Sequence, residues 1–152
     1  GQEFETLALL YQYAQNGEAG HACPIACTAG MIKILQADDQ PHEAWLTHLL
    51  DPDYDTHFHG AQFLTEVQGG SDVGANATTA AQQDDGTWRI TGEKWFCSNT
   101  DADVFLLTAR VDEPRTGTKG LGMFLIPRLR ADGTPEVLTG VPPDDFSADG
   151  ME

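Results

Sequence analysis

FLTEVQGGSD (residues 63–72) marks the point at which the chain changes from helical to strand-like patterning. Residues 62–67 predict a strand, and Gly69 and Gly70 predict a loop, because glycine adopts backbone conformations that other residues avoid. Such a loop offers backbone N–H groups, and the hydroxyls of Thr65 and Ser71, to a pyrophosphate or the edge of a heterocycle. Gly-Gly-Ser-Asp also forms ordinary turns. The loop alone therefore leaves two alternatives, a turn and a ligand site.

The residues before this stretch predict three short helices. Apolar residues recur every three or four positions over residues 4–14, until an Asn-Gly pair interrupts the pattern. A second helix is expected to begin near Pro24, because proline suits the first helical turn. A third is expected over residues 41–50, ending at the Asp-Pro pair that follows. Helices this short enclose little core by themselves.

After the loop, the sequence pattern changes to the two-residue period that is typical of strands. The segments that predict strands are 76–83, 87–91, 94–98, 104–110 and 121–127. A strong turn, Asp84-Asp85-Gly86, separates the first two. The fold class that follows is α+β, with short N-terminal helices and then an antiparallel β-barrel or sandwich. Residues 131–152 are rich in proline, glycine and aspartate, so we expect a loop or partly disordered tail.

Composition narrows the class of protein. The formal net charge of −16 opposes binding to nucleic acid and to anionic membranes, so nucleic-acid partners are not expected. Residues 89–130 carry seven of the eight basic residues and a local excess of two positive charges, which suits either a phosphate-bearing ligand or scattered surface charge. No apolar run is long enough to span a membrane, and the acidic N-terminus is unlike a signal peptide. With three cysteines, these features favour the cytoplasm.

Two further segments make the loop at 63–72 more specific. GEKWFCSN (residues 92–99) follows it by about twenty residues, and GLGMFLIP (residues 120–127) closes the series. In this order and spacing, residues 60–128 resemble the middle domain of the acyl-CoA dehydrogenase family. Residues 16–24 are similar, more loosely, to a helix junction in the alkylation-response subgroup of that family. The resemblance implies a remnant of a helical domain at 1–58, a β-barrel-like middle domain at 59–130 and the tail at 131–152.

The family resemblance implies an FAD site formed by both segments. Phe96 takes the place of the family's flavin-stacking tryptophan, and Ser98 keeps a hydroxyl able to bond a flavin nitrogen. Alternation along a strand would put these two side chains on one face. Ser71 corresponds to the position that also meets the acyl-CoA thioester. The expected flavin-binding residues are Gln62, Phe63, Leu64, Thr65, Gly70, Ser71, Phe96, Cys97 and Ser98.

The resemblance also implies a function that this chain does not complete. The family's catalytic base is a glutamate from a C-terminal helical domain, and the chain ends before that domain; Glu66 lies within the flavin motif and is not expected to be a base. We expect part of an FAD-dependent acyl-CoA dehydrogenase of fatty acid metabolism that binds flavin and thioester and is inactive alone. The implied partners are an acyl-CoA substrate, electron-transfer flavoprotein as electron acceptor and further copies in a homo-oligomer.

Several alternatives remain at this point. The chain could be a flavin or acyl-CoA binding module without turnover, or part of an alkylation-response-like flavoprotein that associates with DNA. Gln62 and Val67 depart from the family pattern, where an aromatic residue and a proline are usual, which puts the substrate class in doubt. A metal site at His21, Cys23 and Cys27 would lack a fourth ligand, and no metal is expected. Cys97 has no adjacent base that would make it a nucleophile.

Overall fold

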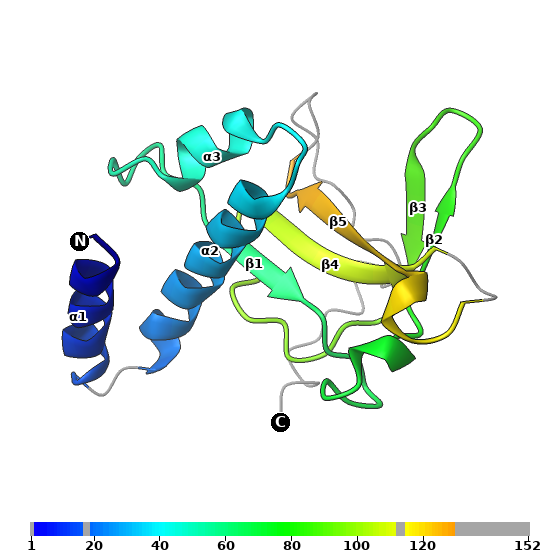
Figure 1. The fold of residues 1–152 in the computed structure, drawn as a ribbon, viewed down its shortest axis with the longest axis horizontal. Coiled ribbons are helices and arrows are strands. Elements are labelled where there is room, and N and C mark those ends of the chain that lie inside the picture. Colours follow the sequence, from blue (N-terminus) through cyan, green and yellow to red (C-terminus); the bar gives the residue numbers. More distant parts are fainter. Residues whose placement is uncertain (1, 17–18, 112–114, 130–152) are drawn as a thin grey trace. The chain divides into compact units, whose positions relative to one another are not determined.

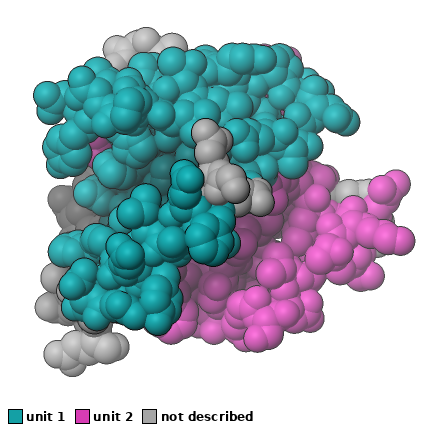
Figure 2. Space-filling model, turned by 60° about the vertical axis from the view of Figure 1, so that its left-hand side comes forward, with its two compact units in different colours: residues 1–62, 98–104 teal, residues 63–97, 105–152 magenta. Residues whose placement is uncertain are grey.

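The computed structural model describes residues 2–16, 19–111 and 115–129 (Figure 1). The chain divides into two compact units (Figure 2). The first unit contains residues 1–62 and 98–104, and the second contains residues 63–97 and 105–152. The predicted tail at 131–152 lies outside the described residues. Within the part of the chain that is described, no helix combines the length and the apolarity that crossing a bilayer requires.

Three helices form most of the first unit, as the sequence predicts: α1 (Gln2–Ala14), α2 (Ala19–Ala37) and α3 (Glu43–Leu49). The expectation that the second helix begins near Pro24 is wrong, because α2 begins at Ala19 and continues through the proline. Alanine-rich sequence on both sides of Pro24 favours the helical state. The missing N–H of a proline removes only one hydrogen bond of the helix.

The helix α2 packs on the start of β1 (Gly60–Phe63) within this unit. Met31 is fully buried, and a Cβ on Gly60 would come within 2.7 Å of its sulfur, so only glycine allows this approach. The Thr28 hydroxyl accepts a hydrogen bond from the Gly60 N–H at 3.0 Å. The Gly60 carbonyl accepts another from Asn99 Nδ2 at 3.1 Å, which connects residues 59–62 to the segment 98–104. The side chain of Gln62 donates to the Cys27 carbonyl.

A mixed sheet forms the centre of the β region. Its strands are β1, β2 (Thr79–Gln82), β3 (Trp88–Thr91), β4 (Val104–Arg110) and β5 (Leu121–Pro127), and two 3-10 turns cover Val73–Ala75 and Gly117–Gly120. The order is β1-β4-β2-β3, with β5 beside β4. The central strand β4 is buried from Val104 to Ala109, and Phe105 stacks on Phe63 with ring centroids 5.0 Å apart.

The sheet confirms the α+β class and corrects its details. β2 and β3 pair antiparallel through the predicted turn, where Gly86 adopts φ +84, but β2 and β4 pair parallel at Thr79 and Arg110. The path of described strands begins at β1 and ends at β3, so it is an open sheet rather than a closed barrel. β1 ends at Phe63 instead of continuing to residue 67, and residues 94–98 form no strand.

Candidate functional site

The two motif segments lie against each other in the second unit. The Trp95 N–H donates to the Thr65 carbonyl at 2.8 Å, so the end of the first segment and the middle of the second are held side by side. The segment 66–69 closes a tight turn, in which the Gly69 N–H donates to the Glu66 carbonyl at 2.8 Å. Gly69 has φ +134, a conformation that glycine adopts most readily. The predicted glycine loop therefore forms, and it begins directly after Thr65.

Gly70 is required at its position by packing. A Cβ there would lie 2.6 Å from the Thr65 hydroxyl oxygen and 3.1 Å from its methyl carbon, closer than carbon atoms approach. Nothing lies within 4 Å of the corresponding position on Gly69. Beside Gly70, Ser71 is exposed. The loop thus presents backbone and a hydroxyl on its open side and contacts Thr65 on the other.

Phe96 is the more exposed of the two aromatic residues in the second segment, with 82% of its surface accessible against 41% for Trp95. Its backbone has φ +55, and Trp95 meets its ring edge to face at a centroid distance of 5.9 Å. Left-handed backbone is rare for a bulky side chain. It also breaks the alternation of side chains, so the argument that Phe96 and Ser98 share one face of a strand is wrong. An exposed aromatic ring, on a segment hydrogen-bonded to the residue that precedes the glycine turn, is suited to stacking on a planar ligand.

The remaining predicted residues lie in three settings. Phe63 is buried against Phe105, so only its backbone is available to a ligand. Cys97 is half-buried, and burial raises the pKa of its thiol, an effect that the Lys94 charge opposes; the neutral thiol is a poor nucleophile. Gln62 and Ser98 belong to the first unit. In the second unit, the hydrogen bond from Trp95 N–H to Thr65 joins the segment that carries the predicted Phe63, Leu64, Thr65, Gly70 and Ser71 to the segment that carries Phe96 and Cys97.

A buried ion pair behind this surface was not foreseen from the sequence. The Glu66 carboxylate is 2% exposed and accepts a hydrogen bond from the Lys94 ammonium at 2.8 Å, whose side chain is 8% exposed. It accepts further bonds from the N–H groups of Ala77 at 2.6 Å and Thr78 at 3.1 Å, and from Gln68 Nε2 at 2.7 Å. Four donors surround this one side chain.

These donors determine the charge state of Glu66. Burial alone would raise its pKa, but the hydrogen bonds lower the pKa to about 2, and the one from Lys94 lowers it most. The carboxylate is therefore ionised at neutral pH, out of contact with solvent, and has its acceptors occupied. A general base needs access to the proton it removes. Glu66 is consequently a structural residue.

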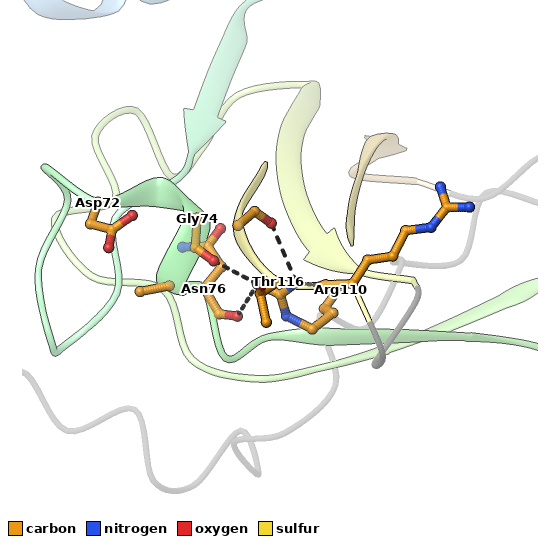
Figure 3. A pocket seen from close by; sticks show the side chains of 8 residues that line it. Asp72, Gly74, Asn76, Arg110 and Thr116 are labelled. Carbon is orange, nitrogen blue, oxygen red and sulfur yellow. Dashed lines mark hydrogen bonds between the residues drawn. The ribbon is translucent and has the colours of Figure 1, made fainter. Parts of the chain in front are cut away.

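An open cleft of about 410 Å³ lies elsewhere in the second unit, next to Arg110 (Figure 3). The guanidinium of Arg110 donates to the carbonyls of Gly74 at 2.7 Å and Arg115 at 2.8 Å, joining the two loops that line the cleft. The local excess of basic residues was the only sequence signal for it. The full lining is Asp72, Gly74, Ala75, Asn76, Arg110, Arg115, Thr116 and Gly117.

The histidines and cysteines form no metal centre among the residues with described positions, where no group of three or more His, Cys, Asp or Glu side chains is arranged to hold an ion. Cys23 and Cys27 lie one turn apart on α2. The pKa of the Cys27 thiol is raised, mainly by burial and to a lesser extent by the neighbouring Cys23 thiol. Protonated thiols are weak metal ligands.

Comparisons with known proteins agree with the order of the motifs. The family model for the middle domain of acyl-CoA dehydrogenases matches residues 61–151, and the model for the N-terminal domain of the adaptive response protein AidB matches residues 1–56. The putative acyl-CoA dehydrogenase AidB of Escherichia coli (strain K12) is 39% identical over 126 residues, which cover 76% of this chain and 22% of that protein.

Solved structures resemble the chain as well. Caenorhabditis elegans ACDH-11, in complex with C11-CoA, aligns with a TM-score of 0.65 at 34% identity, covering 74% of this chain and 21% of that chain. The FAD complex of PigA aligns with a TM-score of 0.60 at 26% identity, covering 71% of this chain and 28% of that chain. The chain thus spans about a fifth of the length of the curated relatives it matches.

Proposed function

The chain belongs to the acyl-CoA dehydrogenase family, and on that premise we propose that it supplies the flavin-binding and thioester-binding part of an FAD-dependent enzyme that desaturates acyl-CoA thioesters between Cα and Cβ. The observation that carries the proposal is the hydrogen bond from Trp95 N–H to the Thr65 carbonyl. It puts the glycine loop and the exposed Phe96 on neighbouring segments, as a site for a planar cofactor with a phosphate arm requires.

The residues present fit a flavin. Gly69 leaves open space where a side chain would stand, Gly70 lets the backbone turn closely over Thr65, and Phe96 offers an exposed aromatic face. We assign the ring to Phe96 and Cys97, and the contacts along the other segment to Thr65, Gly70 and Ser71 together with residues 63–64. The solved PigA structure is an FAD complex, which supports this choice of cofactor. Bound FAD would supply the acceptor for a hydride.

The work of the chain's own residues is binding and orientation. Ser71 is exposed beside the loop and is the residue we assign to the thioester. Acyl-CoA is supported as the substrate class by the C11-CoA complex of the C. elegans relative. We assign no catalytic base to the described residues, because the carboxylate within the motif, Glu66, is buried and ion-paired. We also propose that the complete protein passes its electrons to electron-transfer flavoprotein and assembles into a homo-oligomer.

Two measurements test it. The 152-residue chain, titrated with FAD, is expected to quench flavin fluorescence with saturation. The protein expressed from the complete reading frame is expected to be yellow and to bleach anaerobically with an acyl-CoA. If acyl chains of varied length and branching cause no bleaching, the proposed dehydrogenase activity is excluded. Saturable FAD binding in the same preparation would then support a flavin-binding module without turnover. Absence of both would remove the flavin site.

The match of residues 1–56 to the adaptive response protein AidB favours a second candidate, a flavoprotein of that type that associates with DNA. The charge of −16 on this chain opposes such binding. A salt-dependent mobility shift of duplex DNA by the complete protein, together with no bleaching by acyl-CoA, would favour this candidate over the dehydrogenase. Bleaching without a mobility shift would exclude it.

A further inference from the structure

The second unit contains a polar network that reaches both motif segments from behind. At its centre are Glu66 and Lys94, one from each segment, 28 positions apart in the sequence and joined at 2.8 Å. Both are buried, so neither can touch a ligand that binds on the open side. Their effect on a bound flavin is therefore indirect.

The network extends from the ion pair to the central strand. The Lys94 ammonium also donates to Asn76 Oδ1 at 3.3 Å, and the Thr108 hydroxyl on β4 donates to the same oxygen at 2.5 Å. Asn76 Nδ2 in turn donates to the Leu64 carbonyl at 3.2 Å. Both segments are thus connected through Asn76 to a strand that is buried along almost its whole length.

The position of the pair next to the strained backbone indicates what it does. Lys94 is two residues before Phe96, whose φ of +55 is rarely adopted by an aromatic residue unless neighbouring contacts hold it. Glu66 directly follows Thr65, whose carbonyl binds Trp95. Fixing Lys94 on Glu66 fixes the start of the Phe96 turn relative to Thr65. A buried ion pair adds little net stability compared with apolar packing, but separating its partners is costly because each charge would be left buried and uncompensated.

We propose that Glu66 and Lys94 are positioning residues of the flavin site: their buried contact, anchored on β4 through Asn76 and Thr108, holds Phe96 and Thr65 at the separation that a bound flavin requires. The inference rests on the proposed function, because it names what orients that site. It assigns a role to a carboxylate and an ammonium that bind no ligand themselves.

The test compares Lys94→Met, which removes charge and donors, with Lys94→Gln, which keeps a donor, and with Glu93→Gln as a control on the adjacent exposed carboxylate. Affinity for FAD is measured with the 152-residue chain and with the protein from the complete reading frame. Amide hydrogen exchange is measured on the 152-residue chain without flavin. We expect at least a tenfold loss of FAD affinity in Lys94→Met, partial recovery in Lys94→Gln and no change in the control.

Hydrogen exchange separates positioning from a general loss of structure. Positioning predicts that exchange at the Trp95 amide accelerates more than exchange at the amides of β4, whose protection falls only as far as the global stability does. Equal loss at all amides in Lys94→Gln, or wild-type exchange and affinity in both folded variants, would overturn the proposal. If Lys94→Met does not fold, the FAD affinity and hydrogen exchange of Lys94→Gln alone test the proposal. If the wild-type proteins bind no FAD, the proposed function fails, whereas local loosening at Trp95 would still show that the pair positions these segments.

Discussion

Glu66 and Phe96 each lie one residue from the hydrogen bond between Thr65 and Trp95, yet their surroundings are opposite. Glu66 is 2% exposed and accepts hydrogen bonds from four donors, whereas Phe96 is 82% exposed and has left-handed backbone. One neighbour of this hydrogen bond is a buried carboxylate with its acceptors occupied, and the other is an exposed aromatic ring. The difference separates the parts that maintain the site from the parts that are free to bind a ligand.

This comparison predicts different outcomes for mutations on the two sides. Changes behind the hydrogen bond should reduce stability, because they leave polar groups buried without partners. Changes in front of it should reduce ligand binding with little effect on folding.

Lys94→Met should have the largest effect on stability. The substitution leaves the Glu66 carboxylate buried without its cation, and breaking a buried pair from one side costs about 3 kcal/mol or more. Urea unfolding followed by tryptophan fluorescence measures the free energy of unfolding. Glu93→Gln, beside it and exposed, should change this free energy by less than about 0.5 kcal/mol. Equal effects of the two substitutions would show that the pair is not needed for stability.

Gly70→Ala should have the next largest effect. The added methyl would lie 2.6 Å from the Thr65 hydroxyl, and overpacking of this kind costs about 1–3 kcal/mol. Thr65→Ala removes the atoms that clash, so the double variant should recover most of the loss caused by the glycine substitution. A double-mutant cycle of unfolding free energies measures that coupling. Additive effects would show that the contact between Gly70 and Thr65 is not the cause.

The strands show where sequence patterns are sufficient. β4 and β5 have the predicted bounds, 104–110 and 121–127, because continuous apolar residues and flanking turn residues determine both strands locally. The Asp84–Gly86 turn also forms as predicted, since Gly86 can adopt the positive φ that the turn needs. These features depend on neighbours in the sequence, which periodicity and turn chemistry describe.

The segment 94–98 shows where such patterns fail. Its short run between turn residues predicts a strand, but Lys94 faces a buried carboxylate 28 positions away and Phe96 adopts φ +55. A tertiary contact thus overrides the local preference. The motif order still located the surface of the candidate site. The ion pair behind that surface, and Arg110 at the cleft, required contacts that no local pattern contains.

Acidification should reduce the contribution of the buried Glu66 carboxylate to the free energy of unfolding. The folded pKa of Glu66 is about 2 against an ordinary 4.5, so its contribution to stability is fully present above pH 4.5 and is lost as the pH falls toward 2. In Glu66→Gln the slope of unfolding free energy against pH in this window should become shallower. Asp38, Asp51 and Asp85 also have lowered pKa values and should maintain the residual slope. An unchanged slope would contradict the strong pairing of Glu66.

Phe96→Ala should have the smallest effect on stability, although it removes a large side chain. The ring is exposed and contacts only Trp95 among the aromatic rings of the described residues, so the free energy of unfolding should change by less than about 0.5 kcal/mol. FAD affinity should nevertheless fall about two- to twelvefold, because an aromatic stack contributes about 0.5–1.5 kcal/mol. Tyr54→Ala, an equally exposed aromatic in the first unit, should leave FAD affinity unchanged. If both substitutions weaken FAD binding equally, Phe96 is not the stacking residue, and the division between a maintaining side and a binding side does not hold at this position.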